Sequence, residues 1–454
     1  MNNKYYIQTY GCQMNLYEEG IVCAIMNRAN YTRVDNEYEA DIIFLITCAV
    51  RAHAEQRVLG RLNVLKHLKH SKPDLIIGIL GCLAQNYQNL FNSNDGVDLV
   101  VGPDQYRKLP ELIADFQRTK TKQICCELTL ENYEGIIPKT PSKVTGFVSI
   151  MRGCNNYCAY CIVPYVRGRE RSKSKQQILT EIENLIENGV KDITLVGQNV
   201  LAWHDGSLNF LDLLKIIDKI DGFERLRFIT SHPKDLTQEH LIVFSSLKKF
   251  CPQLHLPLQS GSNRILQLMN RKYTKEEYLA KIEFARKLMP EISLTTDVMV
   301  GFPTETEQDF YETYEVMQKI QFDYAYLFKY SERPYTKALA LHPKVDKVVS
   351  QNRLERLIEL QNKITKQKSQ QYHNKVVEVL IESHNGKQSL GRTKNNKVVI
   401  INEIVDVGKL YQCRIKAVSG WTPIGEIIRT DEQIANKDNI VVNNCSSPNK
   451  KEEM

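Results

Sequence analysis

Short runs of continuously apolar residues alternate with helix-like segments over most of this 454-residue chain. Near the N-terminus the runs lie at 5–11, 42–47 and 75–81, with helix-like segments around 16–29 and 54–70. Strands that are apolar at every position, rather than at alternate positions, are typical of parallel sheets covered by helices on both faces. The pattern therefore predicts an N-terminal parallel α/β domain over residues 1–135.

The alternation resumes after residues 132–146, whose prolines and charged residues are typical of a linker. A helix is expected at 175–188, ended by Gly189, and another after Pro303, where Thr304 and Glu307 match a capping box. We predict a partial (βα)6 barrel over residues 140–370, with catalytic groups at its C-terminal face. Its six expected strands lie at 147–151, 193–197, 225–230, 254–258, 294–300 and 324–329.

The C-terminal part has a different sequence pattern. Strand-like runs at 376–381, 398–400 and 411–415, separated by Gly and Asn turns, predict a small antiparallel β-barrel of the oligonucleotide-binding kind over residues 371–436. Residues 361–430 hold twelve Lys and Arg against five Asp and Glu, which equals the +7 net charge of the whole chain. This balance indicates either a nucleic-acid partner or a solvated basic surface. The polar residues 437–454 predict a disordered tail.

The most specific motif is Cys-x-x-x-Cys-x-x-Cys, formed by Cys154, Cys158 and Cys161. Three thiolates can hold three irons of a 4Fe–4S cluster, whose full ligation takes four cysteines. The next cysteine is Cys251 and the nearest histidine is His204, so one iron would stay open to another ligand. Structural zinc sites usually take two ligand pairs, which makes zinc the weaker alternative. A disulfide framework is not expected in a chain of this length without a secretory signal.

A second set of cysteines, Cys12, Cys48 and Cys82, follows the three N-terminal apolar runs. Parallel strands end at one edge of their sheet, and sites form beyond that edge, so residues distant in the sequence can meet there. The alternative is three buried core cysteines, since Cys is often buried. We predict a second three-cysteine site.

The cysteine motif with Tyr160 inside it, opening six βα units, resembles the radical S-adenosylmethionine (SAM) superfamily. Together with the upstream cysteines and the terminal barrel it resembles the methylthiotransferases, and residues 9–15 (TYGCQMN) resemble their tRNA branch, the MiaB family. The chain departs from that family at 333–336, Arg-Pro-Tyr-Thr in place of the usual Pro-Gly-Thr, and at 201–203, Leu-Ala-Trp in place of Asn-Ser-Tyr. Further stretches that agree are 47–51, 162–172, 196–200, 230–233, 255–262, 269–273 and 296–303.

The resemblance implies an enzyme of the sulfurtransferase class. It would insert a methylthio group at carbon 2 of N6-dimethylallyladenosine at position 37 of tRNA, beside the anticodon, with one SAM as methyl donor and one as radical source. Two 4Fe–4S clusters are implied, one on each cysteine set, and the barrel would be a TRAM domain. The alternatives are methylthiolation of another modified adenosine or of a ribosomal protein, and, more distantly, a non-catalytic RNA-binding metal protein.

The resemblance and the strand ends also suggest contact residues, although strand-end turns and solvated basic faces are the alternatives. The basic run after the cluster loop is expected to hold tRNA phosphates, and basic barrel residues the anticodon arm. The expected RNA contacts are Arg167, Arg169, Arg171, Lys173, Arg392, Lys394, Lys397 and Arg414. The expected SAM contacts are Tyr160, Gly197, Gln198, Asn199, Gln259, Ser260, Val300 and Gly301.

Further expectations concern partners and location. They are a tRNA anticodon stem-loop as substrate, an electron donor such as flavodoxin or ferredoxin, a monomeric state and a cytoplasmic location. No apolar run approaches the ~20 residues of a membrane span, so no membrane partner is expected.

Overall fold

The computed structural model describes residues 3–49, 52–86, 96–140 and 142–429. It divides into two compact units, residues 1–365 and 366–454. The expected C-terminal tail, 437–454, and the last residues of the expected barrel, 430–436, lie outside the described residues. The boundary expected near residues 135–140 falls inside the first unit and stays a prediction.

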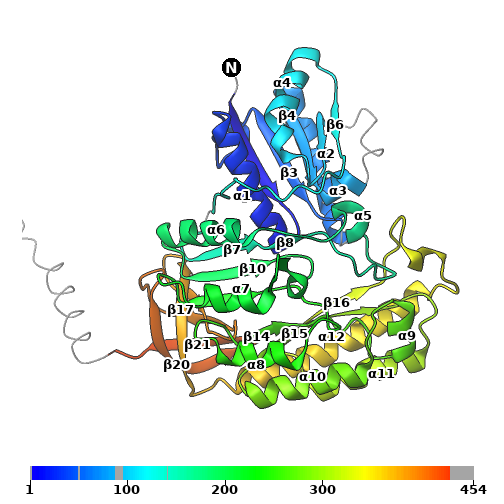
Figure 1. Ribbon diagram of the computed structural model, residues 1–454, viewed down its shortest axis with the longest axis vertical. Coiled ribbons are helices and arrows are strands. Elements are labelled where there is room, and N and C mark those ends of the chain that lie inside the picture. Colours follow the sequence, from blue (N-terminus) through cyan, green and yellow to red (C-terminus); the bar gives the residue numbers. More distant parts are fainter. Residues whose placement is uncertain (1–2, 50–51, 87–95, 141, 430–454) are drawn as a thin grey trace, which may run out of the picture. The chain divides into compact units, whose positions relative to one another are not determined.

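A six-stranded parallel sheet, in the order β2-β1-β3-β4-β5-β6, forms the N-terminal part of the first unit (Figure 1). The expected parallel α/β fold is therefore confirmed. The strands are β1 (Lys4–Thr9), β2 (Thr32–Arg33), β3 (Ile42–Thr47), β4 (Ile76–Gly81), β5 (Leu99–Val101) and β6 (Gln123–Cys125). The helices are α1 (Gln13–Arg28), α2 (Ala52–Ser71), α3 (Cys82–Asn86) and α4 (Leu109–Thr119).

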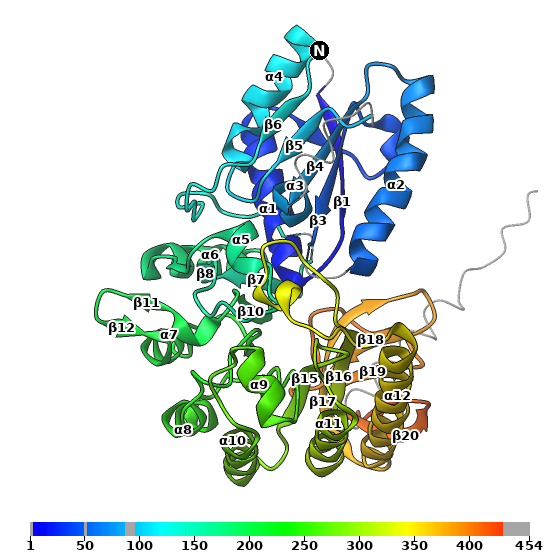
Figure 2. The same ribbon diagram turned by 90° about the vertical axis from the view of Figure 1, so that its right-hand side faces the viewer.

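Both faces of this sheet are covered, which explains why its central strands are apolar throughout. Alternate residues of β3 belong to two separate cores: Phe44 packs with residues of α1 and α4, and Leu45 packs with residues of α2. Figure 2 shows these helices on opposite sides of the sheet. Every residue of β3 and of β4 is buried. In this three-layer arrangement the carboxyl ends of the strands lie at one edge of the sheet. The N-terminal cysteines follow the strands at that edge.

The segment expected to be a linker is packed into this core instead. Tyr133 and Ile136 are buried in the same apolar cluster as α1. The Tyr133 ring stacks on Tyr106 at 5.7 Å, and its hydroxyl donates a hydrogen bond to the Pro103 carbonyl. Two large aromatic anchors thus override the loop signal that Pro and charged residues give in the sequence.

The rest of the first unit has the six expected parallel strands in sequence order. Strands β7 (Thr145–Ser149), β10 (Asp192–Val196) and β13 (Arg225–Phe228) form one sheet, and β14 (Gln253–His255), β15 (Ser293–Val300) and β16 (Tyr324–Lys329) form another. A parallel bridge between Leu226 and Phe250 connects the two, giving an open (βα)6 barrel. Short pairs are β8 (Met151–Arg152) with β9 (Arg171–Ser172) and β11 (His204–Asp205) with β12 (Leu208–Asn209).

Helices cover the outside of this open barrel, and the two expected from the sequence are present. The start of the second was misplaced: the capping box is formed by Thr306 and Asp309, because Thr304 has a positive φ of 71° and lies before the helix. The helices are α5 (Val163–Arg167), α6 (Lys175–Glu187), α7 (Phe210–Ile217), α8 (Gln238–Ser246), α9 (Asn263–Leu268), α10 (Lys275–Leu288), α11 (Glu307–Ile320) and α12 (Lys347–Gln370), which continues into the second unit.

The second unit is a closed five-stranded barrel, in the order β17-β18-β19-β21-β20. The expected small barrel is confirmed, with one correction: β19 and β21 pair in parallel, so closure is not purely antiparallel. Three of these strands match the runs predicted from the sequence, and β18 and β21 were not predicted. The strands are β17 (Val376–His384), β18 (Ser389–Arg392), β19 (Val398–Ile401), β20 (Leu410–Ser419) and β21 (Thr422–Ile427).

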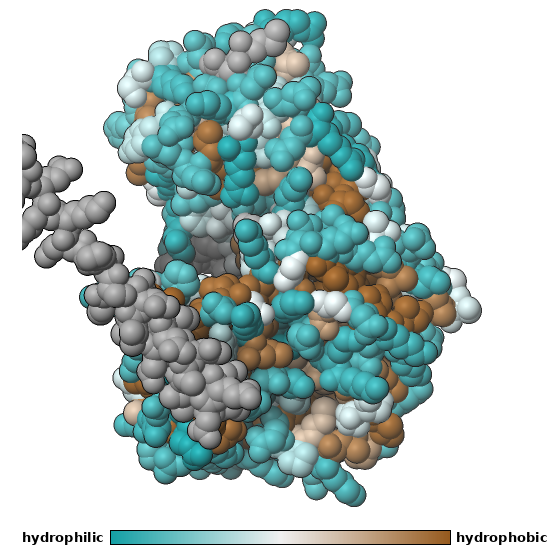
Figure 3. Space-filling view, turned by 90° about the vertical axis from the view of Figure 1, so that its left-hand side faces the viewer, coloured by the Kyte–Doolittle hydropathy of each residue, from teal (hydrophilic) through white to brown (hydrophobic). Residues whose placement is uncertain are grey.

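Among the described residues, no helix is both long and apolar enough to cross a membrane. On the face drawn in Figure 3, apolar patches are interrupted by hydrophilic side chains.

Candidate active site: two sets of three cysteines

The loop after β8 brings Cys154, Cys158 and Cys161 together at the carboxyl end of the first barrel strands. Cys154 and Cys158 are buried and Cys161 is half-buried. The amide of Cys161 donates to the Cys158 carbonyl at 2.9 Å, and the amide of Asn156 donates to the Cys154 sulfur at 3.5 Å. Burial, and then the neighbouring Cys158 charge, raise the pKa of Cys161. The three sulfurs are therefore close enough to interact.

Arg271 is the side chain that the motif did not reveal. It is buried, its Nη1 lies 3.4 Å from the Cys158 sulfur, and its Nη2 donates to the Pro257 carbonyl at 2.9 Å. His232 Nε2 lies 3.9 Å from the same sulfur. Only the similarity of the stretch 269–273 to the MiaB family pointed to this part of the chain. The motif cysteine Cys158 therefore has a buried guanidinium as its neighbour.

The β10 turn expected to contact SAM is organised mainly by internal contacts. Gln198 Oε1 accepts a hydrogen bond from the Gly153 amide at 2.7 Å, which ties this turn to the cluster loop. Asn199 is buried, donates to Asp235 and accepts from the His232 amide. Gly197 is needed for packing, because a Cβ there would lie 2.6 Å from Met151 Cγ. The contacts of these residues with SAM stay predictions.

The two expected SAM contacts that follow the fourth barrel strand, Gln259 and Ser260, are both buried. The expectation that Ser260 contacts SAM is wrong for this structure: Ser260 is fully buried, and its Oγ bonds the Thr313 hydroxyl and accepts from the Ser262 amide. Gln259 has a positive φ of 66° and bridges to Val298.

The other expected SAM contacts lie at the end of β15 and in the cluster loop. Val300 is buried, and Gly301 donates its amide to Glu305 at 2.7 Å. Tyr160 is half-buried, with its hydroxyl 3.5 Å from Arg271. Their contacts with SAM stay predictions.

The second cysteine set gathers at the carboxyl edge of the N-terminal sheet. Cys12 lies three residues after Thr9, the last residue of β1. Cys48 directly follows β3, and Cys82 directly follows β4. A hydrogen bond with Cys48 lowers the pKa of Cys12 to about 6, and the Arg167 charge acts in the same direction. The Cys12 charge in turn contributes to raising the pKa of the buried Cys82, for which desolvation is the largest cause. Adjacent parallel strands have thus closed the long sequence gaps.

A buried arginine connects the two cysteine sets. Arg167 ends α5, six residues after Cys161, and its Nε donates to the Cys82 sulfur at 3.1 Å. Its Nη1 pairs with Glu18 at 2.6 Å, and its Nη2 lies 3.4 Å from Asn15. The side chain is only 4% exposed. The expectation that Arg167 grips tRNA phosphates is therefore wrong for this structure, because the guanidinium is committed to a carboxylate and a thiol.

The rest of the basic run is also mostly internal. Lys173 is buried and pairs with Glu181 at 2.6 Å, and Arg171 is nearly buried and pairs with Asp104. Both are therefore corrected from RNA contacts to internal ion pairs, since a buried cation without a partner would be costly. Arg169 is exposed and stays a predicted RNA contact.

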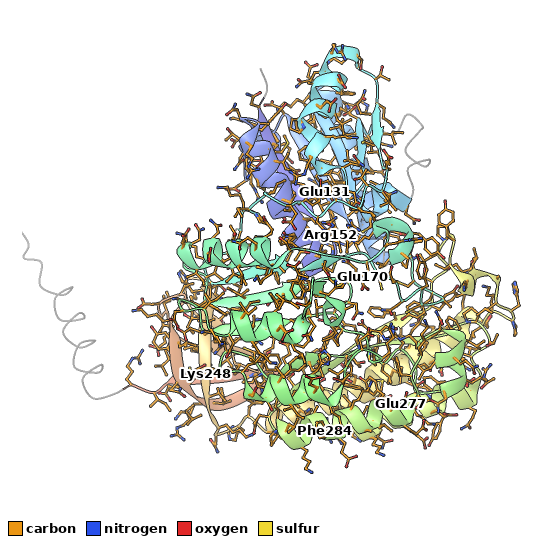
Figure 4. The ribbon with its side chains drawn as sticks, in the orientation of Figure 1. Glu131, Arg152, Glu170, Lys248, Glu277 and Phe284 are labelled. Carbon is orange, nitrogen blue, oxygen red and sulfur yellow. The ribbon has the colours of Figure 1, made fainter. Side chains whose placement is uncertain are left out.

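These pairs belong to a polar layer between the N-terminal sheet and strands β7 and β10, where Figure 4 labels Arg152 and Glu131. Arg152 Nη2 lies 3.0 Å from Glu18 and 3.6 Å from Asp104, with all three side chains at most 2% exposed. Desolvation alone would raise the pKa of Glu18, yet Arg167 and Arg152 hold it below its usual range. In the sequence, Glu18 interrupts the apolar face of α1 one turn after Met14, which was the available signal.

The other expected RNA contacts are basic residues of the barrel in the second unit. Lys394 and Arg414 are exposed. Arg392 pairs with Glu382 at 3.1 Å, and Lys397 donates to the Ser369 hydroxyl at 2.7 Å. RNA contacts by these residues stay predictions.

The chemistry of the two donor sets fits iron–sulfur clusters better than zinc. Over the described ranges, no three His, Cys, Asp or Glu side chains converge on a point where one ion could sit. In a cluster each cysteine binds a different iron, so three separated but neighbouring thiolates are what such a group requires. The resemblance of this cysteine loop to the radical SAM superfamily implies one such cluster and SAM.

Comparisons with known proteins decide the family. The chain is 42% identical over 441 residues to a "tRNA-2-methylthio-N(6)-dimethylallyladenosine synthase" of Thermoanaerobacter sp., covering 94% of this chain and 93% of that protein. It is 44% identical over 410 residues to the protein of the same name from Caldicellulosiruptor saccharolyticus, covering 88% and 86%. The chain belongs to this methylthiotransferase family, the MiaB family.

Domain profiles agree with this MiaB assignment. Residues 148–317 match the "Radical SAM superfamily", residues 4–102 match "Uncharacterized protein family UPF0004", and residues 370–428 match the "TRAM domain". A solved structure of the radical SAM methyltransferase TsrM from Kitasatospora setae, with cobalamin and a 4Fe–4S cluster bound, aligns with a TM-score of 0.57. It covers 75% of this chain and 74% of its own at 12% identity, so the likeness concerns the fold alone.

Gly153, just before Cys154 in the cysteine loop of this MiaB-family chain, gives a testable prediction. It has a positive φ of 74°, and a Cβ there would lie 2.0 Å from the Arg169 carbonyl oxygen. Gly153→Ala is expected to displace the loop, at a cost of at least about 1–3 kcal/mol, and to lower cluster occupancy. Iron content and the visible absorption of the reconstituted protein measure this. Gly135→Ala is the control, because it also has positive φ but an open surrounding; equal iron loss in both variants would contradict the role of the Gly153 contact.

Proposed function

We propose that this chain inserts a methylthio group at carbon 2 of N6-dimethylallyladenosine at position 37 of tRNA. The names of the relatives that it matches over nearly its whole length support this substrate. We also propose a second 4Fe–4S cluster on Cys12, Cys48 and Cys82, beside the radical cluster on the Cys154 set. The observation that carries the proposal is the direct packing of the two cysteine loops in one unit.

That packing is apolar and specific. Ala49 and Cys82 from the N-terminal sheet form one buried cluster with Ile162 and Val166 from the radical-cluster loop and α5. Arg167 adds a hydrogen bond from α5 to Cys82. The two cysteine sets therefore keep a fixed separation, as a reaction that joins a radical and a sulfur at one adenine carbon requires.

The protein's own residues would bind and shield the reactants. When bound, the radical cluster and SAM supply a 5′-deoxyadenosyl radical, which can take hydrogen from a carbon that no side chain could deprotonate. Buried Ala159, Ile162 and Val166 exclude water beside the cysteines, which protects a radical from side reactions. Arg271 holds Cys158, and Gln198 holds the backbone before Cys154.

The finer partners are proposals as well. We propose that the anticodon stem-loop is the part of tRNA that is bound, that a flavodoxin or ferredoxin supplies the electron, and that the protein acts as a monomer in the cytoplasm. Exposed Arg169, Lys394 and Arg414 support a polyanionic partner. In nucleic-acid recognition, contacts with phosphates position the protein, and contacts with bases specify the sequence.

Nucleoside analysis of tRNA tests the function most directly. In cells without this gene, N6-dimethylallyladenosine is expected to accumulate without its methylthio group, and the gene supplied in trans should restore the product. Unchanged tRNA together with loss of a methylthio group from a ribosomal protein would favour the alternative substrate.

Metal analysis tests the cofactors independently of activity. The anaerobically reconstituted chain is expected to hold about eight irons, four for each cluster. About four irons would leave only one cluster, and one zinc with no cleavage of SAM under reduction would contradict the enzyme proposal.

A further inference from the structure

Three exposed tyrosines lie around the radical-cluster loop. Tyr157, between Cys154 and Cys158, is 41% exposed, Tyr165 on α5 is 36% exposed, and Tyr335 after β16 is 69% exposed. The rings of Tyr157 and Tyr165 meet edge to face at 6.5 Å, and those of Tyr165 and Tyr335 lie 5.9 Å apart, tilted by 32°. Segments far apart in the sequence thus build one continuous aromatic surface. Single exposed apolar residues are common on proteins, whereas a continuous surface of them indicates a binding site.

The segments that carry these rings are held against the cluster loop. The Ala338 amide donates to the Ala159 carbonyl at 2.8 Å, three residues after Tyr335. Asn270 Nδ2 donates to the Tyr157 carbonyl at 3.0 Å. The start of the Tyr335 segment is anchored by buried Arg333, which pairs with Glu55 of α2 at 2.6 Å. Figure 2 shows this segment, in yellow, extending from the barrel towards α5 and the N-terminal sheet.

Two of the three tyrosines have a backbone conformation that bulky residues rarely adopt. The φ angle is 47° at Tyr157 and 65° at Tyr335. Each such residue costs about 1–3 kcal/mol, and such strain gathers at functional sites. At Tyr335 the sequence also departs from the Pro-Gly-Thr usual in the family, so an aromatic ring stands where glycine would be unstrained. A strained, mostly exposed ring contributes little to the fold, which leaves binding as its role.

Exposed cations lie close in the chain to the residues that form or support this aromatic surface. Arg169 follows Gly168, whose carbonyl accepts the Cys154 amide. Lys272 and Lys337 are exposed, each two residues from Asn270 and Tyr335 respectively. The acidic neighbour Glu332 pairs with Lys344 at 3.2 Å. The exposed side chains near the rings in the chain thus include three cations that can contact phosphates.

We propose that Tyr157, Tyr165 and Tyr335 form a stacking platform for an unpaired RNA base adjacent to the adenosine that is modified. The proposal rests on the proposed function, which supplies RNA as the substrate. Bases in RNA loops are commonly unstacked and bound on aromatic side chains, while cations hold the backbone. The platform lies on the cluster loop itself, so a base stacked there places its neighbour beside the reacting groups.

Binding of an anticodon stem-loop to the reconstituted full chain tests this platform. The RNA carries N6-dimethylallyladenosine and has 2-aminopurine at one neighbouring loop position at a time, because stacking quenches the fluorescence of that base. The wild type is expected to quench one position. Tyr335→Gly should weaken binding about tenfold to a hundredfold and abolish the quenching, whereas Tyr335→Phe should keep both. Tyr165→Leu should behave like Tyr335→Gly.

Two controls separate binding from folding. Tyr335→Gly relieves the positive φ, so its melting temperature should be equal to or above that of the wild type even though RNA binding falls. Tyr311→Ala removes another exposed tyrosine, on α11, 47% exposed, and should leave RNA affinity unchanged.

The outcomes distinguish this proposal from the function on which it rests. If the wild type methylthiolates tRNA but Tyr335→Gly and Tyr165→Leu bind RNA within twofold of wild type, the platform alone is overturned. Absence of tRNA methylthiolation by the wild type, with a ribosomal protein modified instead, would overturn the proposed function and the RNA platform with it.

Discussion

Cys12→Ala is expected to abolish methylthiolation of tRNA while leaving the reductive cleavage of SAM intact. Cys12 lies at the edge of the N-terminal sheet, where it bonds Cys48, and none of its described contacts reaches the Cys154 set. Loss of this thiolate should remove the second cluster, so iron should fall from about eight to about four per chain. Formation of 5′-deoxyadenosine and of the methylthio nucleoside, measured in the same reaction, gives both results.

The reciprocal variant and a matched control make the test specific. Cys158→Ala should also halve the iron but should abolish 5′-deoxyadenosine formation. Cys125→Ala replaces another partly exposed cysteine, at the end of β6, and should change neither iron nor activity. Equal loss of SAM cleavage in Cys12→Ala and Cys158→Ala would refute the division of labour between the two sites.

Arg167→Gln is expected to destabilise the first unit by less than the roughly 3–5 kcal/mol that a buried carboxylate without any cation costs, because Arg152 remains a charged partner of Glu18. It also removes the donor to Cys82, so occupancy of the second cluster should fall. Urea unfolding followed by circular dichroism measures stability, and iron content measures occupancy. Arg167→Lys should lose part of the effect only, since an ammonium keeps the charge without the guanidinium fork.

The pH dependence and a neighbouring control support the assignment to this ion pair. Arg167 helps to hold the pKa of Glu18 below its usual range, so this stabilisation is present above about pH 4.3 and is lost as the pH falls through the lower folded value. The stability difference between wild type and Arg167→Gln should therefore be largest near neutral pH and should narrow in acid. Arg169→Gln, exposed and two residues away, should stay within about 0.5 kcal/mol of wild type. A similar loss in that variant would show that the effect does not arise from the buried pair.

Much of the fold could be predicted because it depends on short-range pattern. The strands of the open barrel were predicted to within three residues at either end, because short strand-like runs between helix-like segments are a local signal. The mistakes arose where a long-range contact outweighed a local signal. Tyr133 turned an expected linker into core, and Thr306, not Thr304, caps α11.

In the candidate site, too, local sequence pattern predicted some features and long-range contacts decided the others. The sequence by itself determined both sets of cysteines, because ligand chemistry requires that residue type, and Cys12, Cys48 and Cys82 each follow a strand. Only the tertiary structure decided what the charged residues do: Arg167 and Lys173 look like an exposed basic run, yet both are buried against Glu18 and Glu181. Charge in a sequence carries no information about its partner, since the partner can lie more than a hundred residues away and its desolvation is settled only by packing. For the same reason, only the tertiary structure shows the aromatic surface around Tyr335, because it joins two segments that are distant in the sequence.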